Sequence, residues 1–168
     1  MNKVSYALIF LVSGSLYLTS CKFNENRNDD IGNDWPVYGG NSAGNRFSPL
    51  DQINKKNVKQ LQVAWTYNTG ENVDTSQRGR EIQCQPIIVN TVMYGTTPEL
   101  KVFAVNAENG KELWKFDPFV QDEPQYHSNR GVVYWEDGDD KRILFTAGSY
   151  LYAINAENGK LLPTFGNN

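Results

Sequence analysis

The sequence has few of the residues from which metal centres and disulfide frameworks are built. Its 168 residues include two cysteines, Cys21 and Cys84, and one histidine, His127. The cysteines lie 63 residues apart, which excludes the short spacing of a local cysteine metal site. A disulfide between them stays open on this ground alone, whereas an unpaired Cys84 is expected to be a small buried hydrophobic residue.

Charge of one sign and long apolar runs are also scarce. The net charge is only −3, and no basic run or alternation of basic with aromatic residues occurs, so nucleic acid is not an expected partner. The longest apolar run, residues 4–18, falls short of the roughly 20 residues of a membrane span. What the chain does have is 39% hydrophobic and 12% aromatic residues, which fit one globular domain and favour strands.

The first 33 residues have the pattern of an export signal and a tether. A lysine precedes the apolar run of residues 4–18, and the run ends in Leu-Thr-Ser-Cys. This ending resembles a bacterial lipobox, in which Cys21 is lipidated and becomes the first mature residue. We therefore predict a lipoprotein signal peptide over residues 1–20 and a flexible tether over residues 21–33, anchored to a membrane on the periplasmic or cell-envelope side. An ordinary secreted protein with an incidental cysteine is the alternative.

Beyond residue 83, short apolar segments alternate with polar turns, which is the pattern of antiparallel strands. Strands spaced by 8 to 12 residues predict an all-β meander. Polar turns are expected at Asn90-Thr91, at residues 106–110 and in the acidic stretch 136–140. The expected strands are residues 86–89, 92–96, 100–105, 112–116, 131–135, 143–147 and 151–154, with one short helix near residues 54–61.

An eight-residue stretch occurs twice, at residues 104–111 and 153–160, with a single Val-to-Ile difference. The offset of 49 residues is the size of one propeller blade of about four strands. In the first copy Ala104 suits a close approach of blades, Gly110 suits a turn, and Trp114 can pack on a neighbouring blade. The second copy has Pro163 where the tryptophan would stand, so that contact must differ. Since repeats need about three or more units, we expect further blades to be required.

These features together resemble the quinoprotein dehydrogenases, eight-bladed β-propellers that use pyrroloquinoline quinone (PQQ). The Ala-x-Asn-x-x-x-Gly-x-x-x-Trp element is similar to their tryptophan docking motif, and the glucose dehydrogenase branch is the most similar one. The resemblance implies an incomplete propeller over residues 34–168, with only the first one to two blades present. Further segments that carry the resemblance are residues 34–41, 46–58, 61–67, which resembles the first strand, 129–135 and 165–168.

The resemblance places three residues at the cofactor. Arg130, in Asn-Arg-Gly, stands where the family has an arginine beside the quinone, and a guanidinium suits an anionic dicarboxylate. Gln83 stands where relatives carry a cofactor-contacting Glu, so the hydrogen-bonding capacity is kept and the charge is lost. His127 is one residue closer to the arginine than the histidine of glucose-type relatives, and a solvated loop histidine is the alternative. The adjacent cysteines of the methanol-oxidising branch are absent.

The implied reaction is oxidation of a sugar or alcohol hydroxyl, with PQQ as hydride acceptor, calcium as Lewis acid, and a quinone or cytochrome as electron acceptor. In the family, the catalytic aspartate and the calcium ligands lie further along the chain, so no catalytic or metal residue is expected here and the 168-residue chain alone should be inactive. The acidic turn 137–140 and Glu81 are expected to be solvated rather than metal ligands. The alternative function is a non-enzymatic propeller lipoprotein that serves as an assembly scaffold.

Overall fold

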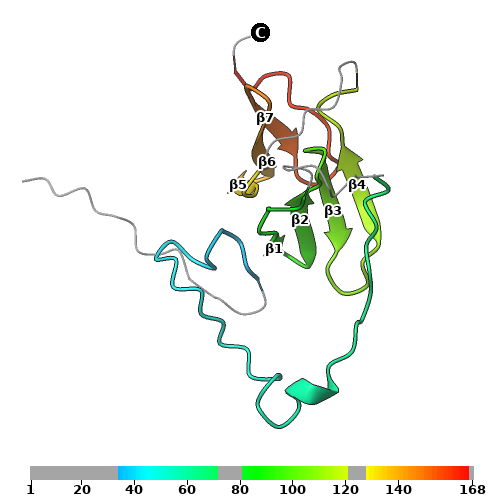
Figure 1. The fold of residues 1–168 in the computed structure, drawn as a ribbon. Coiled ribbons are helices and arrows are strands. Elements are labelled where there is room, and N and C mark those ends of the chain that lie inside the picture. The colour runs from blue at the N-terminus through cyan, green and yellow to red at the C-terminus, as the bar shows by residue number, and fades with distance from the viewer. Residues whose placement is uncertain (1–33, 72–80, 121–127, 167–168) are drawn as a thin grey trace, which may run out of the picture.

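The computed structural model describes residues 34–71, 81–120 and 128–166, and these residues form two antiparallel sheets (Figure 1). In both sheets the order of the strands follows the chain, so the predicted all-β meander is confirmed. Among the described residues the single helix is the short 3-10 turn η1, within the predicted region. The helical turn η1 (Val58–Gln60) comes before the sheets in the chain. The first sheet contains β1 (Ile87–Val89), β2 (Val92–Thr96), β3 (Val102–Asn106) and β4 (Glu112–Phe116). The second sheet contains β5 (Val133–Asp137), β6 (Asp140–Ala147) and β7 (Tyr150–Asn155).

Two tight turns set the register of the first strand pair in each sheet. Asn90 and Thr91 both have positive φ, 49° and 65°, as a two-residue hairpin between twisted strands requires. The acidic turn between β5 and β6 is shorter than predicted, because Asp137 pairs with Asp140 and leaves only Gly138 and Asp139 to turn the chain. Similarly, β3 begins at Val102 rather than at residue 100, since Leu100 has a φ of 61° and belongs to a turn.

The strand predicted at residues 61–67 is not found among the described residues. The segment runs alongside β4, yet its backbone is in no sheet (Figure 1). Its burial alternates along the chain: Trp65, Tyr67, Thr69 and Glu71 are each less exposed than the residues between them. The segment therefore has the side-chain alternation of a strand but lacks a neighbouring strand to complete the hydrogen-bond ladder.

The core lies between the facing sides of the two sheets. Val102 and Ala104 of β3 are fully buried there, as are Ile143 and Ile154 of the second sheet. Aromatic rings extend the contact at one end of the strands, where the centroid of Phe116 lies 5.9 Å from that of Phe145. Burying each large side chain contributes about 1.5–3 kcal/mol, so this contact unites the two sheets.

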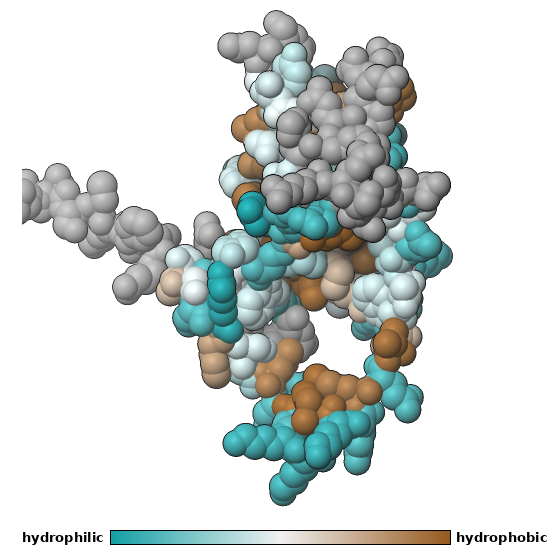
Figure 2. Space-filling view, in the orientation of Figure 1, coloured by the Kyte–Doolittle hydropathy of each residue, from teal (hydrophilic) through white to brown (hydrophobic). Residues whose placement is uncertain are grey.

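Apolar side chains stay exposed on two other surfaces. On the outer face of the second sheet, Val133 and Leu151 are each 56% exposed. Around η1, Ile53 and Leu61 are 59% and 58% exposed, and Figure 2 shows apolar side chains gathered over this loop. Contiguous exposed apolar surface is typical of a contact site. In residues 34–71, 81–120 and 128–166, no helix has the length and apolar character needed to cross a membrane.

Candidate cofactor end and blade contacts

Trp114 of β4 packs on the turn that follows β7. Its indole Nε1 donates a 3.0 Å hydrogen bond to the carbonyl oxygen of Ala156. Gly159 lies directly beneath the ring, because a Cβ added there would lie 2.7 Å from the Cδ2 atom of Trp114. Gly159 also has a φ of 69°, so glycine is required both for the turn and for the close approach.

Trp65 makes the same contact one repeat earlier. Its Nε1 donates to the carbonyl oxygen of Ala107 at 3.0 Å, and a Cβ on Gly110 would lie 2.5 Å from its Cε3 atom. Sequence reasoning did not assign this role to Trp65. The signal was available, because Trp65 precedes Trp114 by 49 residues, the offset of the repeat. Residues 61–67 thus occupy the position that β4 has in the next unit.

The residues named in the docking motif therefore lie at the contacts between successive units. Ala104 is fully buried and pairs with Trp114 across β3 and β4, and Gly110 receives Trp65. Pro163, at the position of the missing tryptophan, is exposed. In each sheet, the turn at Gly110 or Gly159 thus packs on a tryptophan from the preceding segment. The chain after the second sheet has Pro163, not a tryptophan, at the corresponding position.

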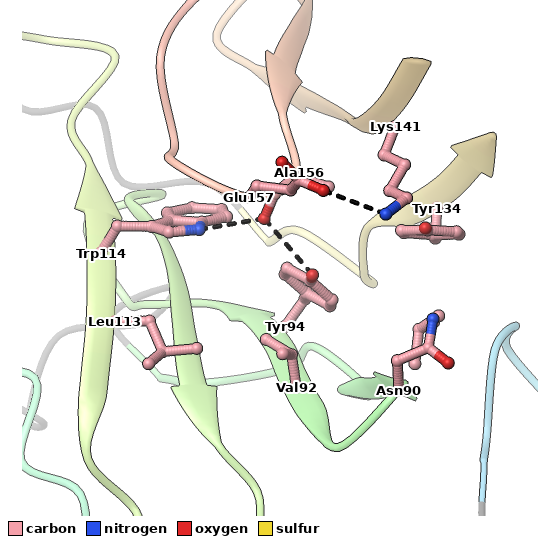
Figure 3. Close-up of a pocket in the computed structure, with 10 residues that line it drawn as sticks. Asn90, Val92, Tyr94, Leu113, Trp114, Tyr134, Lys141, Ala156 and Glu157 are labelled. Carbon is pink, nitrogen blue, oxygen red and sulfur yellow. Dashed lines mark hydrogen bonds and ion pairs between the residues drawn. The ribbon is translucent and has the colours of Figure 1, made fainter. Parts of the chain in front are cut away.

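A cavity of about 280 Å³ opens between the two sheets next to the indole of Trp114 (Figure 3). The hydroxyl of Tyr94 donates to the same Ala156 carbonyl at 3.3 Å, and burial raises the pKa of Tyr94 to about 12. At the mouth, Lys141 Nζ lies 3.0 Å from a carboxylate oxygen of Glu157. Because these polar groups bind one another, the cavity is best described as a seam between blades.

The predicted cofactor segments meet at the opposite end of the strands. The backbone N–H of Gln85 donates to the carbonyl oxygen of Arg130 at 3.1 Å. The two backbones are so close that a Cβ on Gly131 would lie 3.3 Å from the Gln85 oxygen. Residues 83–85 and 129–131, 44 or more residues apart in sequence, therefore form one site.

A buried polar network holds this site in place. Asn129 is 8% exposed, and its Oδ1 accepts from the Gly131 N–H at 2.7 Å while its Nδ2 donates to the Thr146 carbonyl at 2.9 Å. The N–H of Thr96 points to the Sγ of Cys84 at 3.4 Å. Hydrogen bonds from neighbouring residues thus hold both segments, 83–85 and 129–131, in place. Cys84, which is half-buried, is part of this network.

The side chains expected at the cofactor differ in exposure. Arg130 is exposed, whereas Gln83 is half-buried and donates through Nε2 to the Glu81 carboxylate at 2.7 Å. His127 and Cys21 lie outside the described residues. Within the described part of the chain, no group of three or more His, Cys, Asp or Glu residues is arranged to hold a metal ion.

Comparisons with known proteins agree with this architecture. Residues 35–168 match the family described as "PQQ: Glucose/ethanol/alcohol dehydrogenase, beta-propeller domain". The chain is 40% identical over 149 residues to the quinoprotein glucose dehydrogenase of Escherichia coli K12, covering 80% of this chain and 19% of that protein. It is also 40% identical over 134 residues to the dehydrogenase subunit of a quinone alcohol dehydrogenase from Gluconobacter oxydans, covering 77% and 16%.

A solved structure shows the same arrangement of strands. The quinohemoprotein alcohol dehydrogenase from Comamonas testosteroni aligns with a TM-score of 0.63 at 29% identity, over 81% of this chain and 20% of that one. The chain thus spans about a fifth of the length of these relatives. Its two sheets are two blades of their propeller, and the chain belongs to the family of PQQ-dependent glucose, ethanol and alcohol dehydrogenase β-propeller domains.

Proposed function

We propose that the chain supplies the first blades of a PQQ-dependent dehydrogenase that oxidises a sugar hydroxyl, glucose-like in type, or an alcohol hydroxyl. The observation that carries this proposal is the meeting of residues 83–85 with residues 129–131, which brings both expected cofactor segments to one end of the blades. Relatives named as glucose and as alcohol dehydrogenases are similar to this chain to the same degree, so both substrate classes are carried forward.

The donor set fits an anionic quinone cofactor. Arg130 carries an exposed guanidinium, which can bind carboxylate or quinone oxygens through two parallel hydrogen bonds. Gln83 offers an amide in place of the Glu of relatives, so it adds hydrogen bonds without a second negative charge. PQQ, when bound, supplies the hydride-accepting chemistry. The metal ligand set, for calcium or another ion, and the catalytic base are expected on other blades.

Contacts between blades support the need for further blades. Trp65 occupies the place of a fourth-strand tryptophan, yet residues 61–67 have no sheet of their own among the described residues. The exposed Val133 and Leu151 similarly leave the outer face of the second sheet uncovered. Both observations favour a complete propeller as the active unit.

The decisive test is binding of PQQ to the full-length polypeptide that carries these blades. Replacing Arg130 by Ala should weaken PQQ binding about 10- to 150-fold, since a hydrogen bond to a charged group contributes about 1.5–3 kcal/mol. Thermal shift on titration with PQQ and calcium measures the change, because a ligand stabilises the form that binds it. Arg142→Ala is the matched control, since Arg142 binds Asp140 at the other end of the blades. If wild-type protein gains no stability with PQQ, the scaffold function replaces the enzyme.

We further propose that the mature protein is a lipoprotein on the periplasmic or cell-envelope side of a membrane, which passes electrons to a quinone or a cytochrome. The basis is the Leu-Thr-Ser-Cys ending of the apolar run at Cys21. Labelling cells with a radioactive fatty acid should mark the wild-type protein but not Cys21→Ser. Equal labelling of the two proteins would exclude lipidation at Cys21.

A further inference from the structure

A buried carboxylate joins the segment after Trp65 to the first sheet. The side chain of Glu71 is 3% exposed. Its oxygens accept a 2.6 Å hydrogen bond from the Thr97 hydroxyl and a 3.2 Å bond from the N–H of Glu99. Lys101 Nζ lies 3.8 Å away, and burial is the main cause of a raised pKa for Glu71. A carboxyl group is seldom buried without such partners, which indicates a specific role.

The partners of Glu71 all lie in the turn between β2 and β3. In this turn Leu100 has a φ of 61°, a left-handed conformation that a non-glycine residue seldom adopts, and it is only 3% exposed. Its N–H donates to the Thr97 carbonyl at 3.0 Å. Such a turn persists only when its surroundings hold it, and Glu71 binds it at Thr97, at Glu99 and at Lys101.

The same turn leads directly into the polar network of the cofactor end. Thr97 follows Thr96, whose N–H points to the Sγ of Cys84 at 3.4 Å. The Thr96 hydroxyl lies 3.5 Å from Oδ1 of Asn129, the atom that accepts from the Gly131 N–H. Cys84 is adjacent to Gln83, and Asn129 is adjacent to Arg130. Gln83 and Arg130, the residues expected at the cofactor, are thus each the sequence neighbour of a residue that Thr96 contacts.

We propose that Glu71 is a positioning residue of the cofactor end, which holds the β2–β3 turn so that Thr96 fixes the segments carrying Gln83 and Arg130. This inference rests on the proposed function for its consequence on PQQ, but its structural part can be tested without the cofactor. Glu71 acts through Thr97 and Thr96 and does not itself touch the expected cofactor residues.

Other hydrogen bonds also attach the segment that carries Glu71 to the first sheet. Trp65 donates to the Ala107 carbonyl, the Tyr67 hydroxyl donates to Glu112 at 2.5 Å, and Lys115 Nζ donates to the Thr69 carbonyl at 2.9 Å. Loss of Glu71 should therefore leave the segment in place. Tyr67→Phe offers a control on the same segment, because it removes one side-chain hydrogen bond, more exposed than those of Glu71, without touching the β2–β3 turn.

The experiment compares Glu71→Gln, Thr97→Val and Tyr67→Phe in the full-length protein, with two measurements. The first is amide hydrogen exchange without cofactor, followed at residues 96–101 and 129–131. The second is the PQQ dissociation constant from thermal shift. We expect Glu71→Gln and Thr97→Val to speed exchange in both regions and to weaken PQQ binding by about fivefold, as is typical of coupling through a packed network. Tyr67→Phe should change neither measurement.

The outcomes separate this inference from the proposed function. Faster exchange confined to residues 96–101, with residues 129–131 unchanged, would overturn the positioning role whether or not PQQ binds. Faster exchange in both regions in a protein that never binds PQQ would support the structural link and refute the proposed function. The double variant Glu71→Gln/Thr97→Val should lose less PQQ binding than the sum of the two single losses, because both substitutions weaken the hydrogen bond between Thr97 and residue 71. Glu71→Asp, which keeps the charge, should recover part of the binding.

Discussion

The contact between Trp114 and Gly159 makes a quantitative prediction about how the blades are held together. Replacing Gly159 by Ala introduces a methyl group 2.7 Å from the indole and places an L-residue at a φ of 69°. The left-handed backbone costs about 1–2 kcal/mol. The steric overlap adds about 1–3 kcal/mol, since Trp114 must move and its hydrogen bond to Ala156 is strained. We therefore expect the free energy of unfolding to fall by about 2–5 kcal/mol.

Gly138 provides the matched control for this substitution. It has a similar φ of 58°, but no atom lies within 4 Å of the position its Cβ would take. Gly138→Ala should therefore cost only the backbone strain, about 1–2 kcal/mol. Urea denaturation followed by far-ultraviolet circular dichroism gives both values. Equal losses for the two variants would refute the docking contact. The excess loss of Gly159→Ala should also disappear when Trp114 is replaced by Ala, as expected for a contact between the two residues.

Three further predictions concern the seam between the blades. Trp114→Phe removes the indole donor to Ala156 and should lower the free energy of unfolding by about 1 kcal/mol in the same urea assay. Phe145→Ala, in the core between the sheets, should lower it by about 3–5 kcal/mol, and a loss below that of Trp114→Phe would contradict the assigned core. The pKa of Tyr94 is raised from 10 to about 12, so its contribution to the free energy of unfolding is present below pH 10 and is lost as the pH rises from 10 to 12. Tyr94→Phe should therefore show a smaller decline of stability over that pH range.

The strands could be predicted because their side-chain pattern is local. Residues 92–96 and 112–116 are short segments rich in apolar residues, and polar turns bound them, so the predicted limits of these strands match the observed ones. The ends of β3 and β5 were less predictable. Leu100 looks like a strand residue but has a left-handed backbone, and the pairing of Asp137 with Asp140 overrides their preference for turns. Such boundaries depend on cross-strand partners, which a local pattern does not contain.

The candidate site was predictable only in part, for a related reason. Arg130 and Gln83 were found through resemblance to a family, and only the fold shows that their segments share a hydrogen bond. Glu71 carries no motif. Its role depends on Thr97 and Glu99, which lie more than 25 residues away in sequence. Long-range polar contacts of this kind leave no periodic signal.

The docking contacts also give the assembly a direction. The indole of Trp65 packs on Gly110 and that of Trp114 packs on Gly159, so each unit is held by the one before it. At the next position of this series Pro163 has neither a ring of that size nor an N–H to donate. A neighbour on the outer face of the second sheet would therefore have to pack on apolar side chains such as Leu151 without an indole hydrogen bond. Hydrogen exchange should then be faster in β7, which among the described residues pairs with β6 on one side and with Leu161 alone on the other, than in β3, which pairs with β2 and β4.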